Sequence, residues 1–501
     1  MTDSETALPA GKSAGRFGWS ARAQRRVVHA LLCLYVLGFC VFWPNALLVS
    51  DEAQYVSQAI LFARGETTRE VRNVLEGTRA RAPASTYPVG TSALQAPFVG
   101  LGGWRAAPMV SLLAIVGTVL VLSRWLGELS RPPIFASLPL LFVGTLVQGR
   151  LCMSDALTAL ISSLAFWLFS RGERGRRWAW IGAGVFAGLT AAFRDPTPLL
   201  FAPLFVGVLL RRESKAWQLV VGGLAGISVR FITGRLLLGS ALFLRMAGPS
   251  GAPLTLDAVP PNLVLYGFIL ILVIPLGLPS VLLHRGARRV ELVLGTLALM
   301  SVYLLFPLPH DANSPVRDVV LHARYCTALV PLMALTLSEW IPRWLADHIR
   351  LQRILALGVA AAATVLIVTV HWYLYAWGAT LHRITKVIYS VTPEDSVLIV
   401  NPAAMGKFVC EAFGRRDFVS RGSASPEKIA RFVATSGTIY VAFLDRTEAE
   451  ARRQDAAENA RFLARLRALC LVEDLYDMQE SPIERLRIAR VPRCGSNPAG
   501  L

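Results

Sequence analysis

The sequence predicts a polytopic, all-α membrane protein with about 11 transmembrane helices, followed by a small soluble α/β domain. Hydrophobic residues fill 54% of the 501 positions and charged residues only 17%, whereas soluble domains carry about 25% charged residues. The mean hydropathy is +0.49. An intrinsically disordered chain is excluded because apolar residues are abundant. A disulfide-stapled miniprotein is excluded because the chain has only 7 cysteines.

Eleven stretches of the chain are apolar enough to be interpreted as membrane spans, each of which needs roughly 20 residues. The stretches on either side of Arg150, and those on either side of Arg194 and Asp195, are short, so each of these pairs is either spanning or re-entrant. The eleven candidates are residues 27–48, 104–123, 133–149, 155–170, 178–193, 196–210, 217–239, 262–283, 290–306, 325–341 and 354–376.

The distribution of positive charge predicts the orientation of these spans. The net charge is +18, and a cytoplasmic N-terminus places 20 Lys and Arg residues in the short inner segments. The short outer turns carry few, chiefly Arg150, Arg194, Arg245 and Arg317. The positive-inside rule therefore predicts a cytoplasmic tail over residues 1–26, an odd number of spans and an outer C-terminus. The basic charge is spread over loops, so no nucleic-acid partner is expected.

Two outer segments are long enough to have structure of their own. We expect a polytopic domain over 27–376, which includes a first outer loop over 49–103, and an extracytoplasmic α/β domain over 377–501. Cys410, Cys470 and Cys494 lie in this last domain, so one disulfide is expected there, with the pairing left open. The elements predicted in it are strands at 396–401, 437–444 and 484–491 and a helix at 448–471.

The first candidate site follows the first span directly. Asp51 and Glu52 are expected at the outer boundary of the membrane, at the start of an interfacial helix that contains Tyr55. One interpretation is structural, because Ser50 is a good N-cap and acidic residues favour the start of a helix. The other is catalytic: a carboxylate beside a membrane-level cavity accepts a proton from an attacking hydroxyl or amine.

The second candidate site interrupts an apolar stretch with Arg150 and Asp155. The structural interpretation is helix capping, with Ser154 or Asp155 at the start of the next helix. The functional interpretation is a second active-site acid with a cation beside it. Both interpretations stay open at this stage, because the spacing alone favours capping only slightly.

Further candidates are cations on the outer side. Arg324, beside Tyr325 at the mouth of a span, suits an anionic phosphate because a guanidinium offers paired donors. Arg81 in the first outer loop is either a phosphate ligand or a solvated charge. His322, together with His310 and Asp311 upstream of it, shows no compact metal-ligand spacing, so no cofactor is predicted and a divalent metal stays an open alternative.

These residues, in this order along the chain, resemble polytopic glycosyltransferases of the GT-C class. The nearest branch is the bacterial one that contains the protein mannosyltransferase-like and aminoarabinose transferase-like enzymes. The resemblance covers most of residues 27–345. The matching pieces are Asp51-Glu52 with Tyr55, Tyr87-Pro88, Met153-Ser154-Asp155-Ala156, Gly188-Leu189-Thr190 running to Arg194, and Arg324-Tyr325 followed by Pro331 and Leu332.

The resemblance implies a GT-C fold and an inverting hexosyl- or pentosyltransferase of the bacterial cytoplasmic membrane. Its implied partners are membrane lipids, a polyprenyl-phosphate sugar donor, and a glycolipid, polysaccharide or protein acceptor. The run after Tyr87-Pro88 departs from the family pattern, because Val89-Gly90 replaces a proline-richer sequence. The implied roles are Asp51 as base with Glu52 beside it, Asp155 as second acid, Arg324 with Arg150 or Arg81 as phosphate ligands, and Tyr55, Tyr87, Tyr325 and His322 as cavity residues.

The main alternative function is a membrane transporter or lipid flippase. A transporter places its ionisable groups near the middle of the bilayer and is often built from inverted repeats. In this chain the candidate acids and cations lie at the outer boundary instead, and no convincing repeat is found. The inner loops are too short for a nucleotide-binding domain and contain no glycine-rich phosphate loop, which excludes an ATP-driven pump within the chain.

Overall fold

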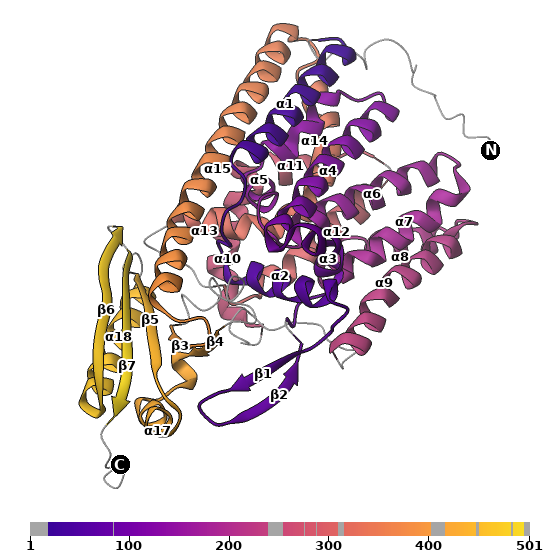
Figure 1. The fold of residues 1–501 in the computed structure, drawn as a ribbon. Helices are drawn as coiled ribbons and strands as arrows, with labels where there is room; N and C mark the ends of the chain where they lie inside the picture. The colour runs from indigo at the N-terminus through magenta and orange to yellow at the C-terminus, as the bar shows by residue number, and fades with distance from the viewer. Residues whose placement is uncertain are drawn as a thin grey trace, which may run out of the picture.

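A computed structural model of the chain shows a large helical part with a smaller α/β domain at one end (Figure 1). The long helix α15 (Ile349–Val391) runs along the helical part and continues into the α/β domain. The structure describes residues 19–83, 85–238, 254–274, 276–286, 288–308, 315–401, 416–446, 450–481 and 484–494.

Within the described residues, six helical stretches are long and apolar enough to cross a membrane. Many of their large apolar side chains are exposed, for example Leu224, Leu236 and Val365. Such surfaces are stable against lipid and unfavourable against water. The chain is therefore a multi-pass membrane protein. The six stretches are Ala21–Val41, Trp104–Glu128, Ala216–Leu237, Leu256–Val273, Asp318–Trp344 and Ile349–Val391.

Most of the predicted spans contain at least one of the helices of the helical part. In chain order they are α1 (Ala21–Val41), α2 (Ser50–Ala63), α3 (Gly90–Gly102), α4 (Pro108–Glu128), α5 (Val143–Gln148), α6 (Asp155–Glu173), α7 (Arg177–Leu189), α8 (Ala202–Leu210), α9 (Ala216–Leu238), α10 (Val259–Phe268), α11 (Gly277–Leu282), α12 (Arg289–Leu304), α13 (Pro315–His322), α14 (Val330–Trp344) and α15.

The predicted count of about 11 spanning helices is not confirmed, and two of the predicted spans are broken. Residues 133–149 form a 3-10 segment, Pro133–Leu140, and then the short α5, because prolines withhold backbone donors from a continuous helix. Residues 262–283 are interrupted by a π turn and by Leu276, whose φ is 57°. The last predicted span, 354–376, is instead the middle of α15, which ends at Val391, two residues before Pro393.

Helices α7 and α9 pack backbone against backbone through glycines. A Cβ atom at Gly188 or Gly184 of α7 would collide with backbone atoms of α9, and one at Gly222 or Gly226 would collide with those of α7. Small residues at four-residue spacing allow this close approach between membrane helices. As a result, α9 lies directly beside the turn that follows α7, which contributes to the site described below.

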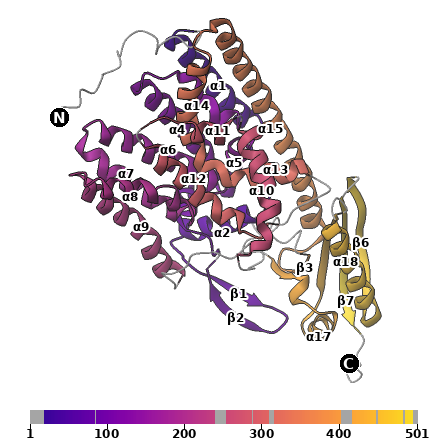
Figure 2. The same ribbon diagram turned by 180° about the vertical axis from the view of Figure 1, so that it is seen from behind.

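The α/β domain is a five-stranded sheet with helices on both faces. Its strand order is β4-β3-β5-β7-β6, with parallel pairs β3–β4 and β3–β5 and antiparallel pairs β5–β7 and β6–β7. One face packs against α17 (Pro426–Ser436) and α18 (Glu450–Leu469), and the other packs against Ile384 and Ile388 of α15 (Figure 2). The strands are β3 (Val397–Val400), β4 (Asp417–Ser420), β5 (Ile439–Arg446), β6 (Cys470–Ser481) and β7 (Glu484–Cys494).

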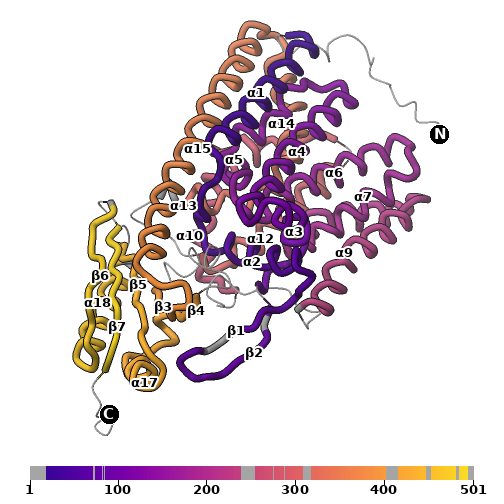
Figure 3. Tube along the Cα trace, in the orientation of Figure 1, coloured from indigo at the N-terminus to yellow at the C-terminus, as the bar shows by residue number. Residues whose placement is uncertain are grey.

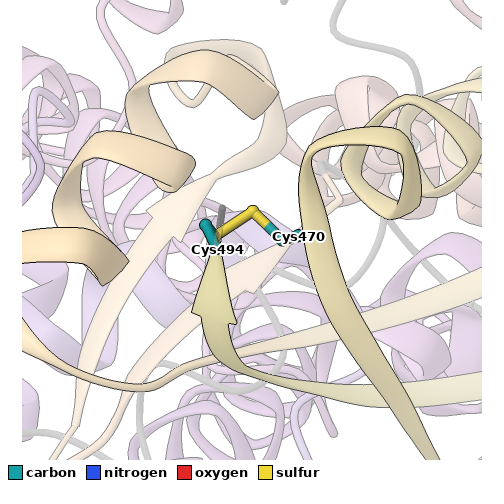
Figure 4. Close-up of a disulfide and its surroundings, with 2 residues drawn as sticks. All are labelled: Cys470 and Cys494. Atoms are coloured by element: carbon teal, nitrogen blue, oxygen red, sulfur yellow. A yellow bond between two sulfur atoms is a disulfide. The ribbon is translucent and has the colours of Figure 1, made fainter. Parts of the chain in front are cut away.

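The strands predicted at 396–401, 437–444 and 484–491 and the helix predicted at 448–471 are confirmed, whereas β4, β6 and α17 were not predicted. The disulfide joins Cys470 to Cys494, at the start of β6 and the end of β7 (Figure 4). The third cysteine of this domain, Cys410, lies outside the described residues.

A two-stranded hairpin in the segment between α2 and α3 extends from the helical part to the α/β domain (Figure 3). It consists of β1 (Arg69–Asn73) and β2 (Thr78–Ala82). At its tip, Val74 and Leu75 pack against the core of the α/β domain, and the Glu76 carboxylate lies 2.5 Å from the Lys428 ammonium of α17. The loop after α2 and the α/β domain therefore lie on the same side of the helical part.

Candidate active site

A cavity of about 270 Å³ opens beside the start of α2. Figure 1 shows α2 at the end of the helical part that lies nearer to the α/β domain. Its walls come from the start of α2, the segment before α3, the turn before α6, the turn after α7, the end of α12 and the turn before α14. The residues that line it are Ser50, Asp51, Gln54, Tyr55, Tyr87, Pro88, Met153, Ser154, Phe193, Arg194, Asp195, Pro196, Tyr303, Phe306, Arg324 and Tyr325.

The Asp51 carboxylate faces a cation in this cavity. Asp51 stands in the first turn of α2, and its Oδ2 lies 3.3 Å from Nη1 of Arg324. The other Nη of Arg324 donates a hydrogen bond to the Tyr325 hydroxyl at 3.0 Å. The acid and the cation that the sequence assigned to different roles are therefore in direct contact, although 273 positions separate them along the chain.

In a second ion pair only the cation, Arg194, lines the cavity, whereas the predicted second acid, Asp155, lies behind it and does not line the cavity. Asp155, whose side chain is fully buried, pairs with Arg194, and Arg194 Nε donates to the Tyr303 hydroxyl at 2.9 Å. The guanidinium carbons of Arg194 and Arg324 lie 4.5 and 5.0 Å from the centre of the Tyr325 ring. One aromatic ring thus contacts both cations and holds them beside the same space.

The residue after Arg194 contributes a third pair. Asp195 lines the cavity and receives two hydrogen bonds from the buried Arg230 of α9, at 2.7 Å from Nε and 3.3 Å from Nη2. The glycine packing of α7 against α9 brings Arg230 to this place. Neither Arg194 nor Asp195 was predicted as a site residue. Two adjacent charged residues within an apolar stretch could have indicated a functional position.

Aromatic side chains form the remaining walls. The Tyr55 and Tyr87 rings stack with centres 4.9 Å apart, and the Tyr55 hydroxyl lies 3.3 Å from the Ser154 hydroxyl. Tyr303 stacks on Tyr325 at 4.8 Å. The predicted cavity residues Tyr55, Tyr87 and Tyr325 therefore line the cavity. His322 does not; it is buried behind Tyr325, with ring centres 6.2 Å apart.

Glu52 does not line the cavity, contrary to the role that the resemblance implies for it. Its side chain is buried, and its carboxylate accepts hydrogen bonds from the backbone N–H groups of Leu48 at 2.6 Å, Val49 at 3.1 Å and Cys152 at 2.8 Å. Burial raises the pKa of the Glu52 carboxyl to about 7, and the three hydrogen bonds oppose that rise. Glu52 thus joins the start of α2 to the turn before α6.

Of the three predicted phosphate ligands, only Arg324 lines the cavity. Arg150 is buried elsewhere: it donates to the Phe42 carbonyl and lies 2.9 Å from Nδ1 of His371 on α15. It therefore ties the end of α1 to α15. Arg81 is exposed on the hairpin strand β2, where its register partner on β1 is Glu70.

The described residues contain no group of three or more His, Cys, Asp or Glu side chains arranged to hold a metal ion. His310 and Asp311 lie outside these residues. What the cavity does offer is a carboxylate beside a guanidinium, a second guanidinium held by a buried acid, and stacked tyrosines. Such a set binds an anion, stacks against a flat or ring-shaped group, and accepts a proton.

Two solved structures are similar to the chain over nearly its whole length. One is a crystal structure of ArnT from Cupriavidus metallidurans in the apo state, with a TM-score of 0.60 and 13% identity, covering 93% of this chain and 98% of that one. The other is ArnT from the same organism bound to undecaprenyl phosphate, with a TM-score of 0.53 and 13% identity, covering 92% and 97%. No protein-family model and no curated protein matches the sequence. The chain therefore shares the fold of these ArnT structures, in line with the aminoarabinose transferase-like resemblance of the motifs.

Proposed function

We propose that the protein is an integral-membrane glycosyltransferase of the bacterial cytoplasmic membrane. It moves a sugar from a polyprenyl-phosphate-linked donor to an acceptor at the outer face, with inversion. The single observation that carries this proposal is the contact between Asp51 and Arg324, 3.3 Å apart in a tyrosine-lined cavity at the ends of apolar helices. A base and an anion-binding cation are the two groups that this reaction requires. The fold shared with ArnT, which binds undecaprenyl phosphate in one of its structures, supports the choice of donor.

In this proposal Arg324 and Arg194 act on the leaving phosphate. As the bond between the anomeric carbon and the phosphate oxygen breaks, negative charge grows on that oxygen. Guanidinium groups that are already in position lower the barrier because they need no rearrangement during the reaction. Asp155 supports Arg194 from behind, and because its carboxylate is fully buried we assign it a positioning role.

Asp51 acts on the acceptor in the same proposal. Its carboxylate takes the proton from the attacking hydroxyl, so that the oxygen becomes a better nucleophile as the new glycosidic bond forms. The stacked Tyr55 and Tyr87 form a flat wall beside it, which suits the face of a sugar ring. Glu52 holds the start of α2 and thereby fixes the place of Asp51, which makes it a positioning residue.

The experiment that tests the proposal measures sugar transfer by the purified protein in lipid nanodiscs. The protein is given a panel of polyprenyl-phosphate sugars as donors and cell-envelope glycans as acceptors. The products are identified by mass spectrometry. We expect transfer by the wild type and a loss of about 10²- to 10⁴-fold in Asp51→Asn. The matched control is Asp347→Asn, which removes one exposed carboxylate on the turn before α15 and should keep full transfer. Undiminished transfer by Asp51→Asn would refute the assignment of the base.

A further inference from the structure

The contact between Asp51 and Arg324 raises a conflict within the proposed reaction. In the structure the two groups neutralise each other. As long as they are paired, the Asp51 carboxylate oxygen that would accept a proton faces the guanidinium, and the Arg324 donor that would bind a phosphate is already in use. Each group therefore blocks the proposed role of the other as long as they remain together.

The geometry of an inverting displacement is a second reason why the two groups cannot stay in contact during the reaction. The attacking oxygen and the leaving phosphate stand on opposite faces of the anomeric carbon, and the sugar lies between them. The base contacts the attacking oxygen and the cation contacts the phosphate. Two groups only 3.3 Å apart leave no room for a sugar between them. Substrate binding must therefore separate Asp51 from Arg324.

The three ion pairs at the cavity differ in how easily they can separate. Asp155 is fully buried, and the bidentate pair of Asp195 with Arg230 has side-chain exposures of 9% and 2%. The Asp51 side chain is 23% exposed and makes one contact with Arg324, at 3.3 Å. A released Asp51 carboxylate can be hydrated, whereas a released Asp155 would remain as a buried charge. The Asp51–Arg324 pair is thus the one suited to exchange.

We propose that Arg324 exchanges partners during the reaction, leaving Asp51 for the phosphate of the donor and returning when the lipid product departs. The donor must then bind first, because it is the donor that releases the base. This inference rests on the proposed function. The interactions of Arg324 with Tyr325, one hydrogen bond at 3.0 Å and one ring contact at 5.0 Å, keep the guanidinium beside the cavity during the exchange.

The exchange fits a balanced reaction. The donor phosphodiester pairs with Arg324 and frees the Asp51 carboxylate. The acceptor oxygen bonds to the anomeric carbon, its proton passes to Asp51, and the electron pair of the broken carbon–oxygen bond stays on the polyprenyl phosphate. After this product leaves, Asp51 gives its proton to water and its carboxylate pairs with Arg324 again. The starting state is thereby restored.

The test is equilibrium binding of undecaprenyl phosphate to the full-length protein in nanodiscs at low ionic strength. In Asp51→Asn the cation has no competing carboxylate, so we expect binding about fivefold tighter than in the wild type, the effect of a partly exposed ion pair. Asp347→Asn removes the same charge far from the cavity and should leave the affinity unchanged. The double variant Asp51→Asn with Arg324→Gln should not show this increase in affinity for undecaprenyl phosphate. Thermal unfolding of each variant checks that it is folded.

The outcomes separate this inference from the function on which it rests. Tighter binding in Asp51→Asn that disappears in the double variant supports the exchange. Equal or weaker binding in Asp51→Asn, with clear binding by the wild type, overturns the exchange and leaves the proposed function standing. Absence of binding in the wild type and in every variant overturns both.

Discussion

Arginine–carboxylate pairs occur at both ends of the helical part, but they are built differently. At the end that holds the cavity, Arg194 and Arg324 contact tyrosine rings and face an open space. At the other end, Glu128 at the end of α4 pairs with Arg124, Arg171 and Arg174. Residues at the far ends of α4 and α6 are thereby tied together, in the segments that the sequence predicts to be cytoplasmic.

Arg288 shows the same pattern at that other end. It lies just before α12 and pairs with both Glu173 and Glu213, so that one cation joins the ends of several helices. Charge alone therefore does not identify the chemical site of this protein. Arg288 also lines a pocket and lies 5.7 Å from the Phe169 ring. The candidate active site differs because two cations contact one ring, that of Tyr325, and one of them pairs with a partly exposed carboxylate.

Removal of a carboxylate should cost much more stability at the cavity end than at the other end. Asp155→Asn leaves Arg194 inside the protein without its buried counter-charge, at a cost of about 3–5 kcal/mol. Glu128→Gln at the other end breaks more exposed pairs and should cost at most about 1 kcal/mol. Thermal unfolding of both variants in nanodiscs measures the difference. Equal losses would contradict the contrast between the two ends.

The cavity end should also depend on the backbone contact between α7 and α9. In Gly226→Val the new side chain meets the backbone of Val185, so the helices must separate, at a cost of about 1–3 kcal/mol. The separation also moves Arg230 away from Asp195. Gly358→Ala is the matched control, because a Cβ at Gly358 meets no atom within 4 Å. Unfolding temperatures and transfer rates are the measurements, and a neutral Gly226→Val would show that the two helices tolerate separation.

Stability should fall with rising pH because of Glu52, which lies outside the membrane spans. Burial raises the pKa of this carboxyl from 4.5 to about 7, so the folded state holds the proton more tightly than the unfolded state. The protonated form therefore gives full stability below about pH 4.5, and this stability is lost as the pH rises through 7, by up to about 1.4 kcal/mol per pH unit.

The measurement for Glu52 is the unfolding midpoint of the wild type and of Glu52→Gln between pH 5 and 8. The variant cannot titrate at this position, so its midpoint should change less with pH. The control Glu128→Gln should keep the wild-type slope. If Glu52→Gln and the wild type have the same slope, Glu52 is not the group responsible.

The smallest effect is expected beyond the cavity, where the hairpin meets the α/β domain. Lys428→Ala removes an exposed ion pair with Glu76 and should change stability by at most about 1 kcal/mol. Substitution of Leu75 by Asp, which places a charge against the apolar core of the α/β domain, should have the larger effect of the two. Limited proteolysis of the hairpin is a direct measurement. If Lys428→Ala exposes the hairpin more than Leu75→Asp does, the apolar contact is not the main attachment.

The part of the site that could be predicted from sequence lies at helix boundaries. Asp51, Arg324 and Tyr325 follow or precede apolar stretches, and the length of those stretches sets their depth. The choice between Asp51 and Glu52 could not be made in this way. Adjacent residues of a helix point in directions about 100° apart, and the rotation of α2 is fixed by contacts with distant residues, such as the hydrogen bond from Cys152 to Glu52.

The positions of the Arg150 and Arg194 side chains also could not be predicted from the sequence. Both stand at short turns between apolar stretches, and only the three-dimensional packing decides where each points. Arg150 turns toward His371, which is 221 positions away in the chain, whereas Arg194 turns toward the cavity, where it meets Asp155 and Tyr303. In the α/β domain the alternating strands β3, β5 and β7 were predictable, but the pairing of Cys470 with Cys494 depends on the register of β6 against β7.

We expect the cavity end, and not the arginine-rich opposite end, to bind a lipid phosphate. A polyprenyl phosphate with a photoreactive diazirine on its first isoprene unit tests this claim most directly. After illumination in nanodiscs and digestion, we predict labelled peptides that contain Asp51, Arg194 or Arg324, and loss of the label in competition with undecaprenyl phosphate. Labelling that is confined to peptides around Arg288 or Glu128 would contradict the account.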